Sequence, residues 1–188
     1  MKNINTKIPI SFESVENIQI NDTRFIRVKI KMMHLGLNLN NSIFTEEVVN
    51  KAIPTLANTP ILGYVELDQN GEPDFTDHRQ DLEIKDGQIK LVYRCVPFGV
   101  IGETNNAHYE TEMCEDGTNR TYLVVDGLVW SKINGSEIFT TYGLKKASME
   151  LSDDNLSYHF DKEGHCVFDS VSFYGITALG ESVTPAMI

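Results

Sequence analysis

A histidine and a serine that lie 70 residues apart have the side chains needed for nucleophilic catalysis. His78 lies in the polar segment Asp74-Phe-Thr-Asp-His-Arg-Gln-Asp81, which predicts an accessible imidazole with Asp74, Asp77 and Asp81 as nearby carboxylates. Ser148 begins the polar side of a later segment. A serine acts as a nucleophile when an imidazole lies within hydrogen-bond reach and two donors stabilise the oxyanion. The alternatives are a solvated loop histidine and an outward-facing serine.

The third member of such a triad would be a group that orients the imidazole. Asp169 interrupts the apolar segment Val167-Phe-Asp-Ser-Val171, where a carboxylate needs a partner or access to solvent. It could therefore orient a histidine or simply face outward. His159 and His165 flank a predicted hairpin and could take that role instead. With the adjacent Cys166 they also suggest a metal site, but three such residues on one hairpin, with no second pair, are a weak zinc signal.

These side chains must be positioned mainly by strands. Alternation of apolar and polar residues predicts strands over 8–12, 25–30, 147–152 and 167–173, with the polar side of the third strand outward. Asp86-Gly87 and Asp116-Gly117 predict tight hairpin turns, because this pair tolerates positive φ. The run from Val96 to Tyr109 is rich in Pro, Gly and Asn and is expected to be a long loop.

Two short helices are expected between the strands. Thr45 can cap a helix that begins with Glu46 and Glu47, and Pro54 would close or kink it. Ser136 is a similar cap for a helix that would extend to Tyr142. Many strands with two short helices predict a single β-rich α+β domain, of which a barrel is one form.

The composition excludes several classes of protein. With 188 residues, 41% hydrophobic and 23% charged, the chain has the composition of one globular domain. The net charge of -11 provides no basic surface for nucleic acid, and no apolar stretch approaches the roughly 20 residues of a membrane span. Three cysteines without Cys-x-x-Cys spacing disfavour a disulfide framework, and we expect reduced thiols in a cytoplasm.

Known catalytic motifs narrow the possibilities further. There is no Gly-x-Ser-x-Gly elbow of an α/β-hydrolase and no glycine-rich phosphate loop. The carboxylates lack the spacing of a glycosidase pair or a calcium loop. The chain stops directly after a structured-looking stretch, which favours a domain cut from a longer polypeptide.

Six segments, taken in order, resemble the prohead maturation proteases of tailed phages. The resemblance covers most of the chain. It is found in Asn58-Thr-Pro-Ile-Leu-Gly63, Asp74-Phe-Thr-Asp-His78, Val96-Pro-Phe-Gly-Val100, Lys146-Ala-Ser-Met-Glu-Leu151, Phe173-Tyr-Gly-Ile-Thr-Ala-Leu-Gly180 and Val183-Thr-Pro-Ala186.

The resemblance implies a fold and a set of catalytic residues. These enzymes are serine proteases similar in fold to the herpesvirus assemblins, so it implies a β-barrel with a few surrounding short helices. His78 then matches the general base and Ser148 the nucleophile. The third member varies in the family, and Asp169 is the first choice, with His165 second. The family often has glycine beside the histidine, whereas Asp77 and Arg79 stand here.

The resemblance also implies an activity and partners. The enzyme would be a serine endopeptidase that cleaves the scaffold protein, the major capsid protein and itself, with no metal or organic cofactor. It would act in the host cytoplasm inside the assembling prohead, could form a homodimer, and would need neither nucleic acid nor membrane. The alternatives are a non-catalytic scaffolding or capsid-assembly module with a protease-like fold, and a β-barrel virion protein without protease ancestry.

Overall fold

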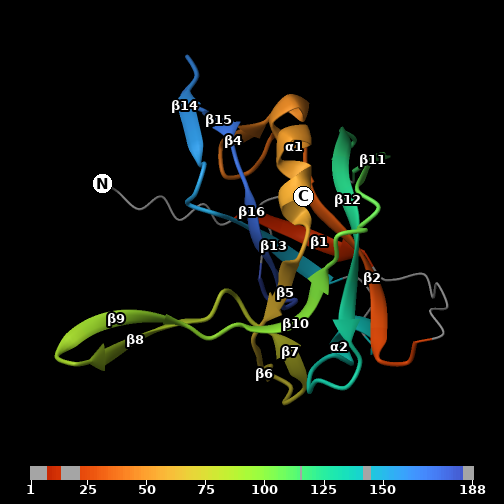
Figure 1. Cartoon of the computed structure of the whole chain (residues 1–188), viewed down its shortest axis with the longest axis vertical. Coiled ribbons are helices and arrows are strands. Elements are labelled where there is room, and N and C mark those ends of the chain that lie inside the picture. The colour runs from red at the N-terminus through yellow and green to blue at the C-terminus, as the bar shows by residue number, and fades with distance from the viewer. Residues whose placement is uncertain (1–7, 14–21, 115, 142–144, 184–188) are drawn as a thin grey trace.

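Strands dominate the chain, as the alternating patterns predict. The computed structural model describes residues 8–13, 22–114, 116–141 and 145–183 (Figure 1). In this part the chain is β-rich with few short helices, which confirms the predicted class. No helix in these ranges is long and apolar enough to cross a membrane.

The largest sheet has eight strands among the described residues, in the order β10-β5-β16-β13-β1-β2-β12-β11. It curls like part of a barrel, and β10 at one end also pairs with β12 near the other. All its pairings are antiparallel except that of β16 with β5. Its strands are β1 (Ile8–Glu13), β2 (Phe25–His34), β5 (Thr59–Gly63), β10 (Val96–Ile101), β11 (His108–Met113), β12 (Asn119–Trp130), β13 (Lys145–Leu151) and β16 (Phe173–Leu179).

The alternation in β2 explains how this sheet is held. Val28 and Ile30 point into the core and are buried. Lys29, between them, lies on the other face, where its Nζ is 2.6 Å from Glu110 Oε1 on β11. One side of the strand thus contributes apolar surface to the core while the other side forms ion pairs in contact with solvent.

Three smaller sheets accompany the main sheet in the described part of the chain. A four-stranded sheet, in the order β14-β15-β4-β3, packs beside the main sheet, and two hairpins, β6–β7 and β8–β9, follow β5 in the chain. Their strands are β3 (Gly36–Leu37), β4 (Ser42–Phe44), β6 (Val65–Leu67), β7 (Pro73–Phe75), β8 (Gln80–Lys85), β9 (Gln88–Tyr93), β14 (Ser157–Phe160) and β15 (Cys166–Ser170).

The first helix begins where the sequence predicts. The hydroxyl of Thr45 accepts a hydrogen bond from Val48 N–H, and α1 spans Glu46–Ala52. A 3₁₀ turn, η1 (Ile53–Leu56), follows and contains Pro54, which cannot continue an α-helix. The second helix, α2, covers Ile138–Thr141, and its predicted end, Tyr142, lies outside the described residues.

Two predicted boundaries were wrong. The expected loop from Val96 to Tyr109 contains the strand β10. This strand can contain a proline and a glycine because its register with β5 shifts between Pro97 and Gly99. A Cβ on Gly99 would lie 2.2 Å from the Leu128 carbonyl oxygen, so a glycine is needed for the contact with β12. The expected last strand over 167–173 is two strands, β15 and β16, in different sheets.

Candidate functional site

Four of the segments named above are neighbouring strands. The segments at residues 58–63, 96–100, 146–151 and 173–180 contain all or nearly all of β5, β10, β13 and β16, which are neighbours in the main sheet in the order β10-β5-β16-β13. The segment that ends at His78 packs on them, and residues 184–186 lie outside the described part of the chain. Segments that are far apart in the sequence are thus brought side by side in the sheet.

Phe75 anchors the segment that bears His78. Its ring is buried, and the ring centroid lies 5.4 Å from that of Phe98 and 5.0 Å from that of Phe139. A Cβ on Gly63 would lie 2.6 Å from the Phe75 ring, so the absence of a side chain there makes room for it. Thr76 N–H also donates to the carbonyl oxygen of residue 64 at 2.9 Å. His78 therefore follows a rigidly packed position by three residues.

The same segment is tied to the end of β16. A Cβ on Gly180 would lie 1.8 Å from the Phe75 carbonyl oxygen, so the two backbones are in close contact. Glu181 N–H donates to the Asp74 carboxylate at 2.9 Å. Asp74 thus ties the segment to the backbone that follows β16.

His78 is nearly buried, so the prediction of an accessible histidine was wrong. Its side chain is 10% exposed, and its Nδ1 lies 3.1 Å from Glu150 Oε1 on β13. The Thr177 hydroxyl on β16 donates to the same carboxylate oxygen. Glu150 thus contacts both His78 and Thr177. Burial removes water from the imidazole, and the carboxylate replaces that water as a fixed, charged partner.

Ser148 belongs to the same surface. It pairs across the sheet with Thr177, while Glu150 pairs with Gly175, so Ser148, Glu150 and Thr177 share one face. Ser148 is 1% exposed, and the prediction of an outward polar side was therefore wrong. This face is covered because its polar groups find partners within the protein, as Glu150 does.

One atom of His78 lacks a hydrogen-bond partner in the part of the chain that the structure describes. Nε2 is buried and makes no hydrogen bond among the described residues. An ionised carboxylate only accepts hydrogen bonds, so in the neutral form of the ring the contact with Glu150 favours the tautomer with the proton on Nδ1 and the lone pair on Nε2. A buried imidazole nitrogen with a free lone pair is chemically a base awaiting a proton donor.

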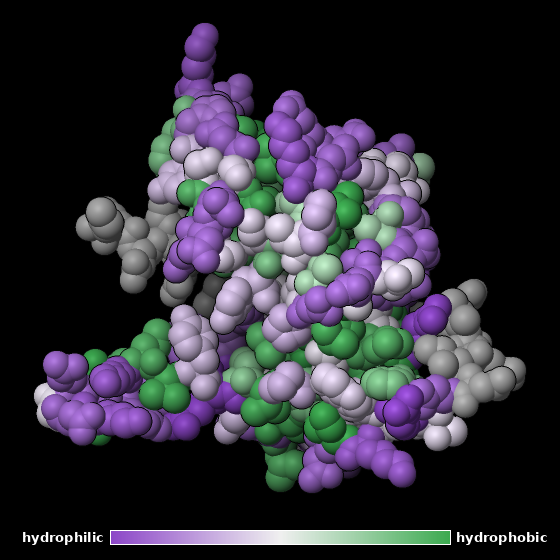
Figure 2. All heavy atoms as spheres, in the orientation of Figure 1, coloured by the Kyte–Doolittle hydropathy of each residue, from purple (hydrophilic) through white to green (hydrophobic). Residues whose placement is uncertain are grey.

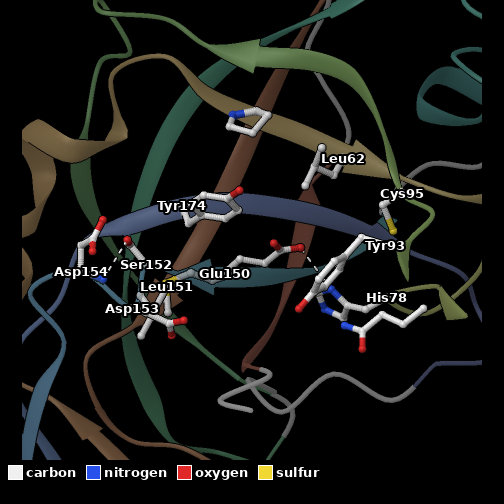
Figure 3. Close-up of a pocket in the computed structure, with 13 residues that line it drawn as sticks. Leu62, His78, Tyr93, Cys95, Glu150, Leu151, Ser152, Asp153, Asp154 and Tyr174 are labelled. Atoms are coloured by element: carbon white, nitrogen blue, oxygen red, sulfur yellow. Dashed lines mark hydrogen bonds and ion pairs between the residues drawn. The ribbon is translucent and has the colours of Figure 1, made fainter. Parts of the chain in front are cut away.

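A cavity of about 720 Å³ opens beside this pair (Figure 3). Figure 3 shows Glu150 extending toward His78, and Tyr174, Tyr93 and Cys95 line the same cavity. Ser148 is not among the residues that line the cavity, although the next residue along β13 is. They are Pro60, Leu62, His78, Gln80, Tyr93, Cys95, Met149, Glu150, Leu151, Ser152, Asp153, Asp154 and Tyr174.

The two predicted third members lie in the β14–β15 hairpin instead. The Asp169 carboxylate lies 2.9 Å from His159 Nδ1, and both side chains are exposed. His165 Nδ1 lies 2.9 Å from Asp161 Oδ2 at the turn of the same hairpin. The structure thus brings His78 to the face that holds Ser148 but pairs Asp169 and His165 with other residues.

Glu150 is the residue that sequence reasoning missed. The carboxylates close to His78 in sequence have other contacts: Asp77 accepts from the His78 backbone N–H at 2.6 Å. Asp81 accepts from Arg94 at 2.9 Å, and this hydrogen bond is the main reason that the pKa of Asp81 lies below its ordinary value. The available signal was the spacing of Ser148 and Glu150, since residues two apart on a strand share a face.

One group of side chains has the spacing of metal ligands. Ligand atoms of Asp161, Glu163 and His165 lie within 4.8 Å of one another. The Asp161 carboxylate already accepts from the His165 backbone N–H at 2.8 Å, the leading cause of its lowered pKa, and from Glu163 N–H at 2.9 Å. These bonds are those of an Asx turn, which accounts for the cluster without an ion.

Comparison with known proteins identifies the family. Residues 24–188 match the family model described as the YonD N-terminal domain. None of the curated proteins matches the chain, and none of the solved structures does. Because the family model covers most of the sequence, the chain belongs to the family of YonD N-terminal domains.

Proposed function

We propose that this domain is a serine endopeptidase of the prohead maturation type. Ser148 is the nucleophile, His78 is the general base, and Glu150 orients His78. The observation that carries the proposal is the contact of His78 Nδ1 with Glu150 Oε1 at 3.1 Å, because Glu150 shares a strand face with Ser148. The other ring nitrogen, Nε2, is buried and has no hydrogen-bond partner among the described residues. Glu150 takes the third position here, in place of Asp169 or His165.

The chemistry is acyl transfer in two steps. His78 Nε2 takes the proton of the Ser148 hydroxyl as its oxygen attacks a peptide carbonyl, and backbone N–H groups stabilise the oxyanion. The imidazolium then gives that proton to the leaving amine as the C–N bond breaks and a serine ester remains. Water, deprotonated by the same nitrogen, hydrolyses the ester. Glu150 stabilises the imidazolium in both steps and keeps its ring in position.

The fold and the biological setting of this proposal follow the same resemblance. The curled main sheet, in which β10 also pairs with β12, supports an assemblin-like barrel. The substrates would be the scaffold protein, the major capsid protein and the chain itself, inside the prohead in the host cytoplasm. The enzyme would need no metal or organic cofactor and could act as a homodimer.

One observation favours a second candidate, a non-catalytic scaffolding or capsid-assembly module. Ser148 is 1% exposed and does not line the cavity. A peptide carbonyl can reach its hydroxyl only after the groups above it move. A domain that kept the protease-like sheet for assembly alone would have no need of that movement.

Co-expression with the capsid and scaffold proteins separates the two candidates. We expect new termini in these proteins, read by intact mass, when the domain is present, and none when it carries Ser148→Ala. Cleavage that continues with Ser148→Ala would refute Ser148 as the nucleophile. Normal capsid assembly without cleavage in either form would favour the scaffolding module.

Gly175 tests the position of Glu150 without touching a reacting atom. A Cβ at Gly175 would lie 3.3 Å from Glu150 Oε2 and 3.3 Å from Leu62 Cδ1, so Gly175→Ala must displace the carboxylate slightly. We expect kcat to fall roughly tenfold, since a displacement of about 1 Å can cost about 10²-fold. Gly102→Ala is the matched control, because nothing lies within 4 Å of a Cβ there. Equal kcat values for the two variants, at unchanged melting temperature, would contradict this role of Glu150.

A further inference from the structure

The β8–β9 hairpin projects from the body of the domain (Figure 1). It exposes a row of apolar side chains. Four aliphatic residues of this hairpin, at 49% to 80% exposure, would normally be covered in a folded protein. They are Leu82, Ile84, Ile89 and Leu91. Figure 2 shows hydrophobic residues on the surface of this projection, between its hydrophilic ones.

The register gathers these side chains on one face. Leu82 pairs with Leu91 and Ile84 with Ile89, and cross-strand partners share a face. The other face is charged: the Arg94 guanidinium there hydrogen-bonds both Asp81 and Glu83. The hairpin is therefore held by its turn and by the ion pairs on its charged face, and its apolar face is left for another molecule.

The apolar face continues into the candidate site. Gln80 pairs with Tyr93 at the base of the hairpin, on the same face as the aliphatic residues, and both line the cavity beside His78. Each strand has six residues, which corresponds to about 20 Å of extended chain. A continuous surface thus runs from the tip of the hairpin to the imidazole, long enough for about six extended residues of a polypeptide.

The charges show which occupant suits this surface. Residues 80–94 contain three acidic and three basic residues and are neutral, whereas the chain as a whole has a net charge of -11. A second copy would bring the same negative charge to the surface. The cavity is lined by Glu150, Asp153 and Asp154, and no lysine or arginine of the described residues is among its lining. A segment that enters the cavity is therefore favoured when it is neutral or basic.

We propose that the β8–β9 hairpin is a substrate-binding arm. It holds an extended polypeptide whose every second residue is apolar, and the neutral or basic residues that follow enter the cavity beside His78. The inference rests on the proposed endopeptidase function and adds the class of substrate, an unfolded segment recognised over a length well beyond the cleaved bond.

The test measures binding apart from catalysis. The probe is a fluorescein-labelled 12-residue peptide in which Val-Thr-Val-Thr-Val-Thr is followed by Gly-Ala-Lys-Gly-Ala-Lys. The control peptide has each Val replaced by Thr. Fluorescence anisotropy gives Kd for the full chain carrying Ser148→Ala, with and without Ile84→Thr and Ile89→Thr. Threonine keeps the β-branched shape that strands favour, so the hairpin is retained. Leu67→Thr, at a residue 71% exposed outside the arm, is the matched control.

We expect the two arm substitutions to raise Kd for the Val peptide at least tenfold and the control to leave it unchanged. The Thr peptide should bind at least tenfold more weakly than the Val peptide. Equal Kd values with and without the arm substitutions would overturn the arm. A dimer in sedimentation that the arm substitutions dissolve, with no peptide bound, would also overturn it, in favour of a second copy.

Failure of the arm can be told apart from failure of the proposed function. Hydrolysis of reduced, carboxymethylated α-lactalbumin, an unfolded polypeptide, reports the function by its dependence on Ser148. Hydrolysis at the same kcat/KM with and without the arm substitutions would refute the arm as a substrate-binding site and leave the endopeptidase function supported. Peptide binding that depends on the arm, without any hydrolysis, would refute the endopeptidase function and support the arm as a binding surface.

Discussion

Replacing Ser148 by alanine is expected to lower kcat for a polypeptide substrate by a factor of about 10⁵ or more, because the acyl-enzyme cannot form. His78→Ala should cost a similar factor, because the hydroxyl then keeps its proton. The two residues act as a unit, so the double variant should be no slower than either single one. Single-turnover hydrolysis of an unfolded polypeptide measures all three variants.

We expect these variants to fold, so a loss of kcat can be assigned to catalysis. Ser148→Ala removes one buried hydroxyl from β13 and leaves the strand pairing intact, so far-ultraviolet circular dichroism should be unchanged. Multiplicative losses in the double variant, or full activity of Ser148→Ala, would contradict the shared role of the two residues.

Glu150→Gln is expected to lower kcat by a factor of about 10³ to 10⁴, the scale seen when the carboxylate of a serine protease triad is neutralised. The amide keeps the size of the side chain but loses the charge that stabilises the imidazolium. Its NH₂ group can also donate to His78 Nδ1, which would put the ring proton on Nε2 and leave no base there. The same hydrolysis assay measures the effect.

Asp169→Asn is the matched control for this change. Asp169 is an exposed carboxylate that also contacts a histidine, but that histidine is His159 in another sheet. We expect kcat to change less than twofold. A larger loss for Asp169→Asn than for Glu150→Gln would return the third position to Asp169.

The parts of the fold that could be predicted are those in which local chemistry decides the structure. Asp86 and Gly87 have φ of 55° and 74°, which is the turn that this pair favours between two strands. The Thr45 cap and the start of α1 follow in the same way from side-chain and backbone hydrogen bonds within one turn.

The parts that could not be predicted depend on contacts between distant segments. The segment after Val96 reads as a loop by composition, yet Gly99 is needed so that β10 can approach β12. The alternating pattern predicts that Ser148 faces outward. Alternation assigns residues to the two faces of a strand, but it does not predict which segment packs on each face. The segment that carries His78 covers the polar face, and nothing near Ser148 in sequence reveals it.

The candidate site shows the same division. His78 and Ser148 could be proposed from ordered motifs, and the structure brings His78 onto the face that holds Ser148. The carboxylate could not be assigned, because Asp169 and Glu150 are both plausible acids in the sequence. Only the side-chain contacts in the structure distinguish them, because Glu150 on β13 contacts His78 and Asp169 contacts His159.

The most direct measurement is covalent labelling by diisopropyl fluorophosphate, which reacts with a serine hydroxyl that a neighbouring base has activated. The chain, His78→Ala and Asp169→Asn are each treated, digested and read by peptide mass. The account predicts one phosphoryl adduct, on the peptide that contains Ser148, formed in the unchanged chain and in Asp169→Asn and lost in His78→Ala. An adduct on another serine, or the same rate of labelling at Ser148 after His78→Ala, would contradict it.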